Sequence, residues 1–215
     1  MELKFGVVGT GHLGRLHTKF FGENEKAELI GVYDIDETKA NEVATEFNTK
    51  AFNDLEELFD KVNAVSIVAS TSAHYELMKM AIDKGLHILV EKPITSEIWQ
   101  AEELLKAAED KNLKIQVGHI ERFNPALLSL NKYELEPKFI ETDRLAQFNP
   151  RGIDVAVIHD LMIHDIDIIL NLIKSEVSEV RASGIAVVSD HIDIANARLE
   201  FANGSVANVT ASRIS

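Results

Sequence analysis

The sequence predicts an α/β fold in two domains: a doubly wound parallel sheet over residues 1–120, and an α+β domain with an open, mainly antiparallel sheet over residues 121–215. Up to about residue 118, short apolar runs alternate with amphipathic helical segments, which is typical of a parallel sheet with helices on both faces. Past Pro125, one apolar helix precedes long stretches of alternating polarity, which favour an open antiparallel or mixed sheet.

The expected elements follow from periodicity and from turn residues. Buried strands are predicted at LKFGVVG (3–9), ELIGVYD (28–34), AVSIVAS (64–70), HILVEKP (87–93) and KIQVGH (114–119). Helices are predicted at 36–47, at 72–85 with Gly85 as the stop, and at 96–112 with Ser96 as the start. A further helix over about 157–173 precedes strands within 178–189, 193–201 and 204–215. Because the alternation still runs at Ser215, we expect a chain truncated at its C-terminus.

Composition excludes several classes of function. A net charge of −13 argues against nucleic acid or an anionic membrane as a partner. The absence of cysteine excludes disulfides and thiol chemistry. No signal-peptide pattern opens the chain, and no apolar run approaches the ~20 residues of a membrane span. We therefore expect a cytoplasmic protein.

A glycine-rich turn, GTGHLG, directly follows the first strand and opens a helix. Gly9 permits the tight turn, Gly11 lets the backbone approach a pyrophosphate, and Gly14 lets helix and strand pack closely. Asp34 ends the second strand, 20 residues past Gly14, where a carboxylate can bind ribose hydroxyls and would repel a 2′-phosphate. The pattern predicts a Rossmann domain that binds NAD rather than NADP, although Lys39 leaves that choice open. The expected cofactor-binding residues are Gly9, Thr10, Gly11, His12, Leu13, Gly14, Asp34, Ser70, Thr71, Glu91 and Lys92.

Three other positively charged or titratable side chains invite a functional interpretation. Lys92, in VEKPI, ends a strand at the carboxyl edge of the sheet, where open α/β folds bind ligands, and Pro93 restricts its backbone. The alternative is an ordinary solvated lysine. His17 follows the glycine loop and is expected to pack on or near the cofactor, whereas His74 is expected at a helix start.

The segment HDLMIHDIDIIL (159–170) combines a strongly apolar composition with histidines and aspartates. On a helix of 100° per residue, Asp160, His164, Asp167 and Asn171 fall within a stripe about 60° wide. We predict a largely buried helix whose polar stripe lines a wet pocket. An ordinary core helix with a thin solvated edge is the alternative, and Asp165, which lies off the stripe, is interpreted as a structural or interface acid.

Taken together, GTGHLG (9–14), LVEKPI (89–94), ERFNP (121–125) and DLMIHDID (160–167) resemble the glucose–fructose oxidoreductase / inositol dehydrogenase / MocA family. The resemblance implies an N-terminal NAD(P)-binding Rossmann domain and a C-terminal α/β domain that closes the site. It further implies that Lys92, Asp160 and His164 are the catalytic residues, that Lys92–Pro93 is a cis peptide, and that the protein forms homodimers or homotetramers.

Within this family, the run from GHIERFNP to the C-terminus resembles the subgroup associated with UDP-N-acetylglucosamine 3-dehydrogenase, which makes 3-amino sugars for lipid A. The resemblance implies oxidation of a secondary sugar hydroxyl, with a nucleotide sugar as substrate. Arg122, Arg144 and Arg151 could supply cations for its diphosphate, or they could balance nearby acids such as Glu121. The expected substrate-binding residues are Lys92, Arg122, Asn124, Arg151, Asp160 and His164.

Alcohol oxidation needs a base, and the ordinary titration range of histidine suits His164 for it. Asp160 would orient the imidazole and Lys92 would stabilise the developing alkoxide, although the roles of lysine and histidine could be exchanged. Alternatives are a metal site at Asp160, His164 and Asp167, a non-catalytic NAD-binding protein, and a dehydrogenase of free polyols or monosaccharides. We expect no metal.

Overall fold

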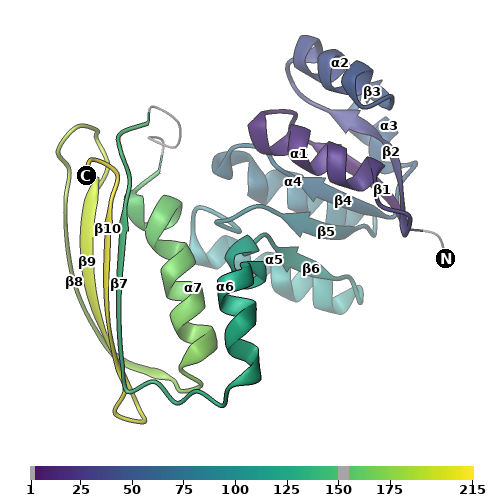
Figure 1. Ribbon diagram of the computed structural model, residues 1–215. Helices are drawn as coiled ribbons and strands as arrows, with labels where there is room; N and C mark the ends of the chain where they lie inside the picture. Colours follow the sequence, from purple (N-terminus) through teal and green to yellow (C-terminus); the bar gives the residue numbers. More distant parts are fainter. Residues whose placement is uncertain (1–2, 150–154) are drawn as a thin grey trace. The chain divides into compact units, whose positions relative to one another are not determined.

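The computed structural model describes residues 3–149 and 155–215. The chain divides into two compact units, Met1–Gly118 and His119–Ser215 (Figure 1). Within the described residues, no helix is long and apolar enough to cross a membrane.

The N-terminal unit contains a six-stranded parallel sheet in the order β3-β2-β1-β4-β5-β6, which confirms the predicted doubly wound α/β fold (Figure 1). The order reverses between β1 and β4, so the loops that follow these two strands lie at the ligand-binding edge. The elements are β1 (Leu3–Val8), α1 (His12–Gly22), β2 (Ala27–Tyr33), α2 (Glu37–Glu46), β3 (Lys50–Phe52), α3 (Leu55–Phe59), β4 (Ala64–Ile67), α4 (Thr71–Asp83), β5 (His87–Val90), α5 (Ile98–Asp110) and β6 (Ile115–Val117).

Apolar cores lie on both faces of this sheet. Successive strand residues point to opposite faces, and accordingly Val8 belongs to one core and Val7 to the other. Helices α3, α4 and α5 bury side chains in the first core, and α2 buries Val43 and Ala44 in the second. Burial on both faces explains why these strands read as continuous apolar runs.

Three local predictions for this unit need correction. Strand β3 and helix α3 were not expected, because three and five residues are too short to show a period. The signal that could have found α3 is Asp54, whose side chain caps the helix by accepting from the amide of Glu56. Helix α5 is capped by Glu97 with Gln100 rather than by Ser96, in a reciprocal capping box. Gly85 follows the end of α4 with a φ of 75°, as expected for a helix stop.

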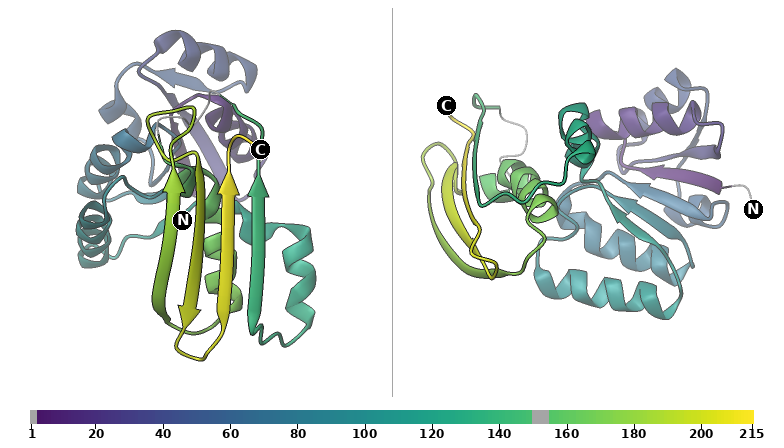
Figure 2. Two further views of the ribbon diagram at one scale, coloured as in Figure 1. Left: turned by 90° about the vertical axis from the view of Figure 1, so that its left-hand side faces the viewer. Right: turned by 60° about the horizontal axis from the view of Figure 1, so that its bottom comes forward.

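The C-terminal unit contains a four-stranded mixed sheet in the order β7-β10-β9-β8, in which β7 and β10 are parallel and the other pairs are antiparallel (Figure 2, left). Strand β7 was not predicted, because FIETDRL alternates in burial but not in polarity. The elements are η1 (Ile120–Phe123), α6 (Pro125–Leu128), η2 (Ser129–Lys132), β7 (Phe139–Leu145), η3 (Ile158–Met162), α7 (Ile163–Leu172), β8 (Val177–Ile185), β9 (Ile194–Phe201) and β10 (Val206–Ser212).

The helical segment formed by η3 and α7 packs on one face of the sheet, where Met162, Ile169 and Ile173 contact small residues of β9 and β10. Its course differs from the uniform α-helix expected over 157–173. Residues 158–162 form a π-helical segment, η3, before α7 begins at Ile163. A π-turn holds more residues than an α-turn, so positions before and after Ile163 do not keep the 100° spacing that was assumed for a single polar stripe.

Candidate functional site

The glycine loop forms at the carboxyl end of β1. Gly9 adopts a φ of 95°, a conformation that glycine tolerates and that would be strained for a residue with a side chain. Its amide donates to the carbonyl of Tyr33 at 2.8 Å. Gly11 is the N-cap of α1 and offers no side chain as an acceptor for the first-turn amides. These amides and the positive end of the helix dipole therefore make a site that suits phosphate.

The three glycines of the loop serve different purposes. A Cβ on Gly14 would collide with the carbonyl oxygen of Gly9, so this position is closed to any side chain. A Cβ on Gly9 would lie 2.7 Å from the carbonyl oxygen of Val68. A Cβ on Gly11 would meet no atom within 4 Å. Packing therefore explains Gly9 and Gly14, while the open space at Gly11 fits the approach of a bound dinucleotide.

Asp34 links the end of β2 to the glycine loop. Its Oδ2 accepts from the backbone amide of Thr10 at 2.7 Å and from the Thr10 hydroxyl at 2.9 Å, and its Oδ1 accepts from the Asp36 amide at 2.9 Å. These bonds orient the carboxylate and occupy both lone pairs of Oδ2, while Oδ1 keeps one lone pair for a ribose hydroxyl. Lys39 pairs with Asp36 at 3.0 Å, so the positive charge that left the NADP question open is balanced by a neighbouring acid.

The loop after β4 leads into α4 at the same edge of the sheet. Ser70 is the N-cap of α4 and Thr71 is its first residue, and the Ser70 hydroxyl lies 3.3 Å from that of Ser72. Because β4 adjoins β1, this places both predicted cofactor residues beside the glycine loop, whose Gly9 packs against Val68.

The EKP turn, formed by Glu91, Lys92 and Pro93, follows β5. It contains a cis peptide between Lys92 and Pro93, as the family resemblance implies. Glu91 accepts from His17 Nε2 at 3.1 Å and from the Lys92 amide at 3.3 Å. Burial raises the pKa of Glu91, but the hydrogen bond and charge of His17, together with Lys92, outweigh it and leave this pKa below its usual range. Glu91 is therefore a carboxylate held by its protein neighbours.

His74 contacts the EKP turn at Pro93. Its side chain is buried, with Nδ1 at 3.0 Å from the Pro93 carbonyl and Nε2 at 3.1 Å from the Ala69 carbonyl. The expectation of an ordinary helix-start residue misses this role, because only the fold brings position 74 to Pro93. His74 thus ties the loop after β4 to the EKP turn.

In the C-terminal unit, Asp160 lies in η3 and His164 in the first turn of α7. Both side chains are partly exposed, and the Asp160 amide donates to the Ala156 carbonyl at 3.2 Å. On α7, the acids that are buried are Asp165 and Asp167 instead. The catalytic roles of Asp160 and His164 stay predictions.

Asp167 binds Arg122 in a bidentate ion pair, with Nε to Oδ2 at 2.7 Å and Nη2 to Oδ1 at 2.5 Å. Burial raises the pKa of Asp167, but the hydrogen bond from Arg122 and the charges of His119, Arg122 and His164 lower it further than burial raises it. Within residues 3–149 and 155–215, no three histidine or acidic side chains gather as metal ligands, and Asp167 gives both its oxygens to Arg122.

Asp165 is held in the same way by Arg144, with Nε to Oδ2 and Nη2 to Oδ1 both at 2.8 Å. Arg144 Nη1 also lies 3.8 Å from Glu121 Oε1. Arg144 therefore balances the charge of nearby acids, which was the alternative to binding a diphosphate. Its hydrogen bond with Asp165 raises the pKa of Arg144 further, despite the opposing effect of burial. Asp165 is therefore the structural acid expected from its place off the stripe, joining α7 to β7.

Two other predicted substrate residues have different outcomes. Asn124 caps α6 by accepting from the Ala126 amide at 3.0 Å, and its amide nitrogen donates to Glu121 at 3.0 Å. Both ends of its side chain are therefore used locally. Arg151 lies outside the described residues.

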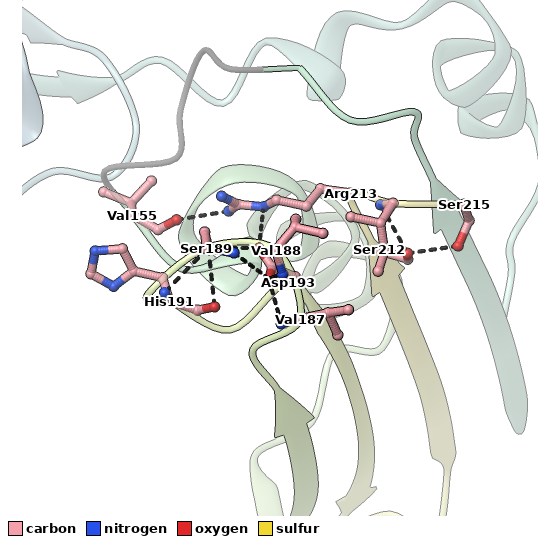
Figure 3. A network of polar contacts seen from close by, with 10 residues as sticks. Val155, Val187, Val188, Ser189, His191, Asp193, Ser212, Arg213 and Ser215 are labelled. Carbon is pink, nitrogen blue, oxygen red and sulfur yellow. Dashed lines mark hydrogen bonds and ion pairs between the residues drawn. The ribbon is translucent and has the colours of Figure 1, made fainter.

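The buried carboxylate of Asp193 accepts hydrogen bonds from the backbone of the loop between β8 and β9 (Figure 3). Asp193 Oδ2 accepts from the amides of Val187, Val188 and Ser189 at 2.7, 2.7 and 3.0 Å, and the Ser189 hydroxyl donates to Oδ1 at 2.7 Å. These bonds, led by the one from Val187, hold the pKa of Asp193 far below its usual value despite burial.

The same loop supports the start of the helical segment. Arg213 Nη2 donates to the Val155 carbonyl at 2.7 Å, and its backbone amide donates to the Asp193 carbonyl at 3.0 Å (Figure 3). The amide of Val157 donates to the Ile192 carbonyl at 2.8 Å. These bonds fix the backbone that leads into η3, which carries Asp160.

Replacing Gly11 and Gly14 by alanine separates binding from packing. Gly11→Ala should leave the melting temperature nearly unchanged and raise the NAD dissociation constant at least about tenfold, since the methyl group occupies the approach path of the pyrophosphate. Gly14→Ala should cost about 2 kcal/mol or more of unfolding free energy, because its methyl group meets the Gly9 carbonyl. Fluorescence titration and thermal melting measure the two effects, and equal loss of stability in both variants would contradict the assignment.

Arg144→Met should lower the unfolding free energy by about 3 kcal/mol, because it strands the buried Asp165 carboxylate. The double variant Arg144→Met/Asp165→Leu, which removes both charges, should recover to within about 1 kcal/mol of wild type. Urea unfolding at neutral pH measures both. A double variant as unstable as the single one would show that the charges themselves, rather than the stranded acid, matter.

Acid should destabilise the protein partly through Asp193. Because its folded pKa lies below the usual value of 3.8, the unfolded chain binds the proton more readily, and the stabilisation is present above pH 3.8 and lost as pH falls below it. Unfolding free energy measured from pH 5 to pH 2 should therefore fall more steeply in wild type than in Asp193→Asn. Parallel slopes would contradict the role of this carboxylate, since Asp167 and Glu91 contribute equally to both proteins.

Comparison with known proteins agrees with this geometry. Residues 3–119 match the Gfo/Idh/MocA oxidoreductase family with an NAD-binding Rossmann fold, and residues 137–215 match the Gfo/Idh/MocA C-terminal domain. Over 215 residues, all of this chain, it is 41% identical to UDP-N-acetylglucosamine 3-dehydrogenase from Acidithiobacillus ferrooxidans, spanning 68% of that protein.

A solved structure of the Acidithiobacillus ferrooxidans enzyme superposes with a TM-score of 0.94, covering 100% of this chain and 71% of that one. The chain is also 32% identical over 197 residues to inositol 2-dehydrogenase/D-chiro-inositol 3-dehydrogenase from Halalkalibacterium halodurans, covering 85% of this chain and 56% of that protein. With the glycine loop, Asp34 and the cis-proline turn in place, the chain belongs to the Gfo/Idh/MocA family of NAD-binding oxidoreductases and is a dehydrogenase.

Proposed function

We propose that the protein oxidises a secondary hydroxyl of a nucleotide sugar, UDP-N-acetylglucosamine at C3, with NAD as the oxidant. The observation that carries this proposal is the 41% identity over the whole chain to an enzyme of that name, together with a TM-score of 0.94 to its structure. The chain spans 68% of that relative, so the activity of the whole protein is part of the proposal.

The residues of the N-terminal unit fit the cofactor. The first-turn amides of α1 and the open space at Gly11 suit the pyrophosphate, and the oriented Asp34 carboxylate suits ribose hydroxyls. NAD, when bound, accepts the hydride from the sugar carbon. We assign Gly11 and Asp34 the main binding roles, with Ser70 and Thr71 contributing from the start of α4.

The chain's own acid–base groups would move the remaining proton. We assign His164 as the base that accepts the hydroxyl proton, since neutral imidazole is available near pH 7. Asp160 would orient that imidazole or bind a neighbouring hydroxyl. The Lys92 ammonium would hydrogen-bond the reacting oxygen and stabilise its negative charge as the proton leaves.

Arg122 and Arg144 support the binding of a diphosphate less strongly than the sequence alone suggested. Arg122 and Arg144 each commit two N–H groups to a carboxylate, so they neutralise the acids of α7 before any ligand arrives. Half of the Arg122 side chain remains exposed (49%), and its other N–H groups can still donate to an anion. The nucleotide part of the proposal therefore rests mainly on the relative.

A dehydrogenase of free polyols or monosaccharides is the second candidate, favoured by the 32% identity to an inositol dehydrogenase. Its substrate would need no diphosphate-binding cations, which agrees with the paired arginines. Cytoplasmic location, a homodimer or homotetramer, and a place in lipid A synthesis stay predictions attached to the first candidate.

We expect absorbance of reduced nicotinamide to appear when the protein is mixed with NAD and UDP-N-acetylglucosamine, but not with N-acetylglucosamine alone. Inositol and glucose test the second candidate under the same conditions. His164→Ala should lower turnover roughly 10²- to 10⁴-fold while NAD binding, measured by fluorescence, is retained.

Three outcomes would redirect the proposal. Reduction with inositol alone would replace the nucleotide sugar by a free polyol. Full turnover in His164→Ala would move the base to another residue. NAD binding without turnover on any of these sugars would favour the non-catalytic interpretation for this chain.

A further inference from the structure

A chain of hydrogen bonds crosses the N-terminal unit from the interior of the sheet to the EKP turn. His17, on α1, places Nδ1 at 2.7 Å from the Ser66 hydroxyl and Nε2 at 3.1 Å from Glu91 Oε1. Ser66 lies within β4 and is fully buried, whereas Glu91 directly follows β5. The imidazole therefore joins three elements that are far apart in the sequence.

The chemistry of the partners sets the direction of these bonds. Glu91 is a carboxylate and can only accept, so the hydrogen on Nε2 of His17 donates to it. In the neutral imidazole, Nδ1 then accepts from the Ser66 hydroxyl. In the charged imidazole, which lowers the pKa of Glu91, Nδ1 donates to that hydroxyl instead. Ser66 has no exposed surface, which excludes it as a nucleophile despite the Ser–His–Glu order.

The Glu91 carboxylate is held on its other sides as well. The Lys92 amide lies 3.3 Å from its Oε2. A Cβ on Gly118 would come within 2.8 Å of its Oε1, so the absence of a side chain there leaves the carboxylate its space. Glu91 thus contacts both His17 and the backbone of Lys92.

We propose that His17 is a positioning residue that acts through Glu91 to fix the backbone of Lys92 and so aim its ammonium at the sugar oxygen. The inference rests on the proposed function, because it takes Lys92 as the group that contacts the reacting oxygen. It also explains why this imidazole, expected near the cofactor from its place after the glycine loop, turns its nitrogens toward β4 and the EKP turn.

The two amide side chains that resemble histidine separate this role from simple packing. In His17→Gln, the new side-chain amide nitrogen can take the place of Nε2 and donate to Glu91, whereas His17→Asn presents its polar group near the position of Nδ1 and loses Glu91. We expect His17→Gln to retain turnover within about threefold, and His17→Asn to lose up to about 100-fold in kcat with an unchanged NAD dissociation constant. His87→Gln, which alters a histidine at the opposite end of β5, is the matched control and should leave kcat unchanged.

Equal losses in the two His17 variants, or a loss confined to NAD binding, would overturn the proposal. So would full turnover in His17→Asn. Each of these results would show that the contact with Glu91 does not govern Lys92.

A second measurement does not depend on turnover. After ¹³C-methylation of the lysines, the NMR signal of Lys92, identified by its loss in Lys92→Arg, should shift in His17→Asn and keep its wild-type position in His17→Gln. An unshifted signal in both variants would overturn the inference. If the wild-type protein oxidises none of the sugars, the proposed function fails while this spectrum still decides whether His17 positions Lys92.

Discussion

The close approach of α1 to β1 is the constraint on which the rest of the N-terminal unit depends. No side chain fits between Gly14 and the Gly9 carbonyl, so the helix leaves the strand within three residues and aims its first-turn amides at the sheet edge. The same placement lets Asp34 bind Thr10 across the loop and lets His17, further along α1, reach the EKP turn. One backbone contact thus places both the glycine loop and the imidazole that contacts Glu91.

In the C-terminal unit, the main constraint is the burial of acidic side chains on an apolar helix. Asp165 and Asp167 lie on α7 among isoleucines, and each is neutralised by a bidentate arginine from another element, Arg144 on β7 and Arg122 on η1. A buried carboxylate without such a partner would cost several kcal/mol. The pairs therefore anchor the helix that carries His164.

Much of the fold could be predicted because its signals are local. Parallel strands buried on both faces appear as apolar runs, and the glycine loop needs particular residues at particular positions. Short elements such as β3 and α3 carry no period, and the residues of β7 do not alternate in polarity along the strand. The π-helical turn in η3 leaves no trace in composition, so a stripe drawn on an ideal helix misplaced Asp160 relative to the three stripe residues of α7.

The sequence by itself determined the doubly wound sheet, the dinucleotide loop with Asp34, and the family of oxidoreductases, because each shows as short motifs or periodic runs along the chain. Only the tertiary structure decided which charges are paired with one another. Arg122 with Asp167 and His17 with Glu91 are separated by 45 and 74 positions, and no spacing rule links them. Their pairing follows from where the sheet and helix bring them, since an ion pair or hydrogen bond depends on distance in space.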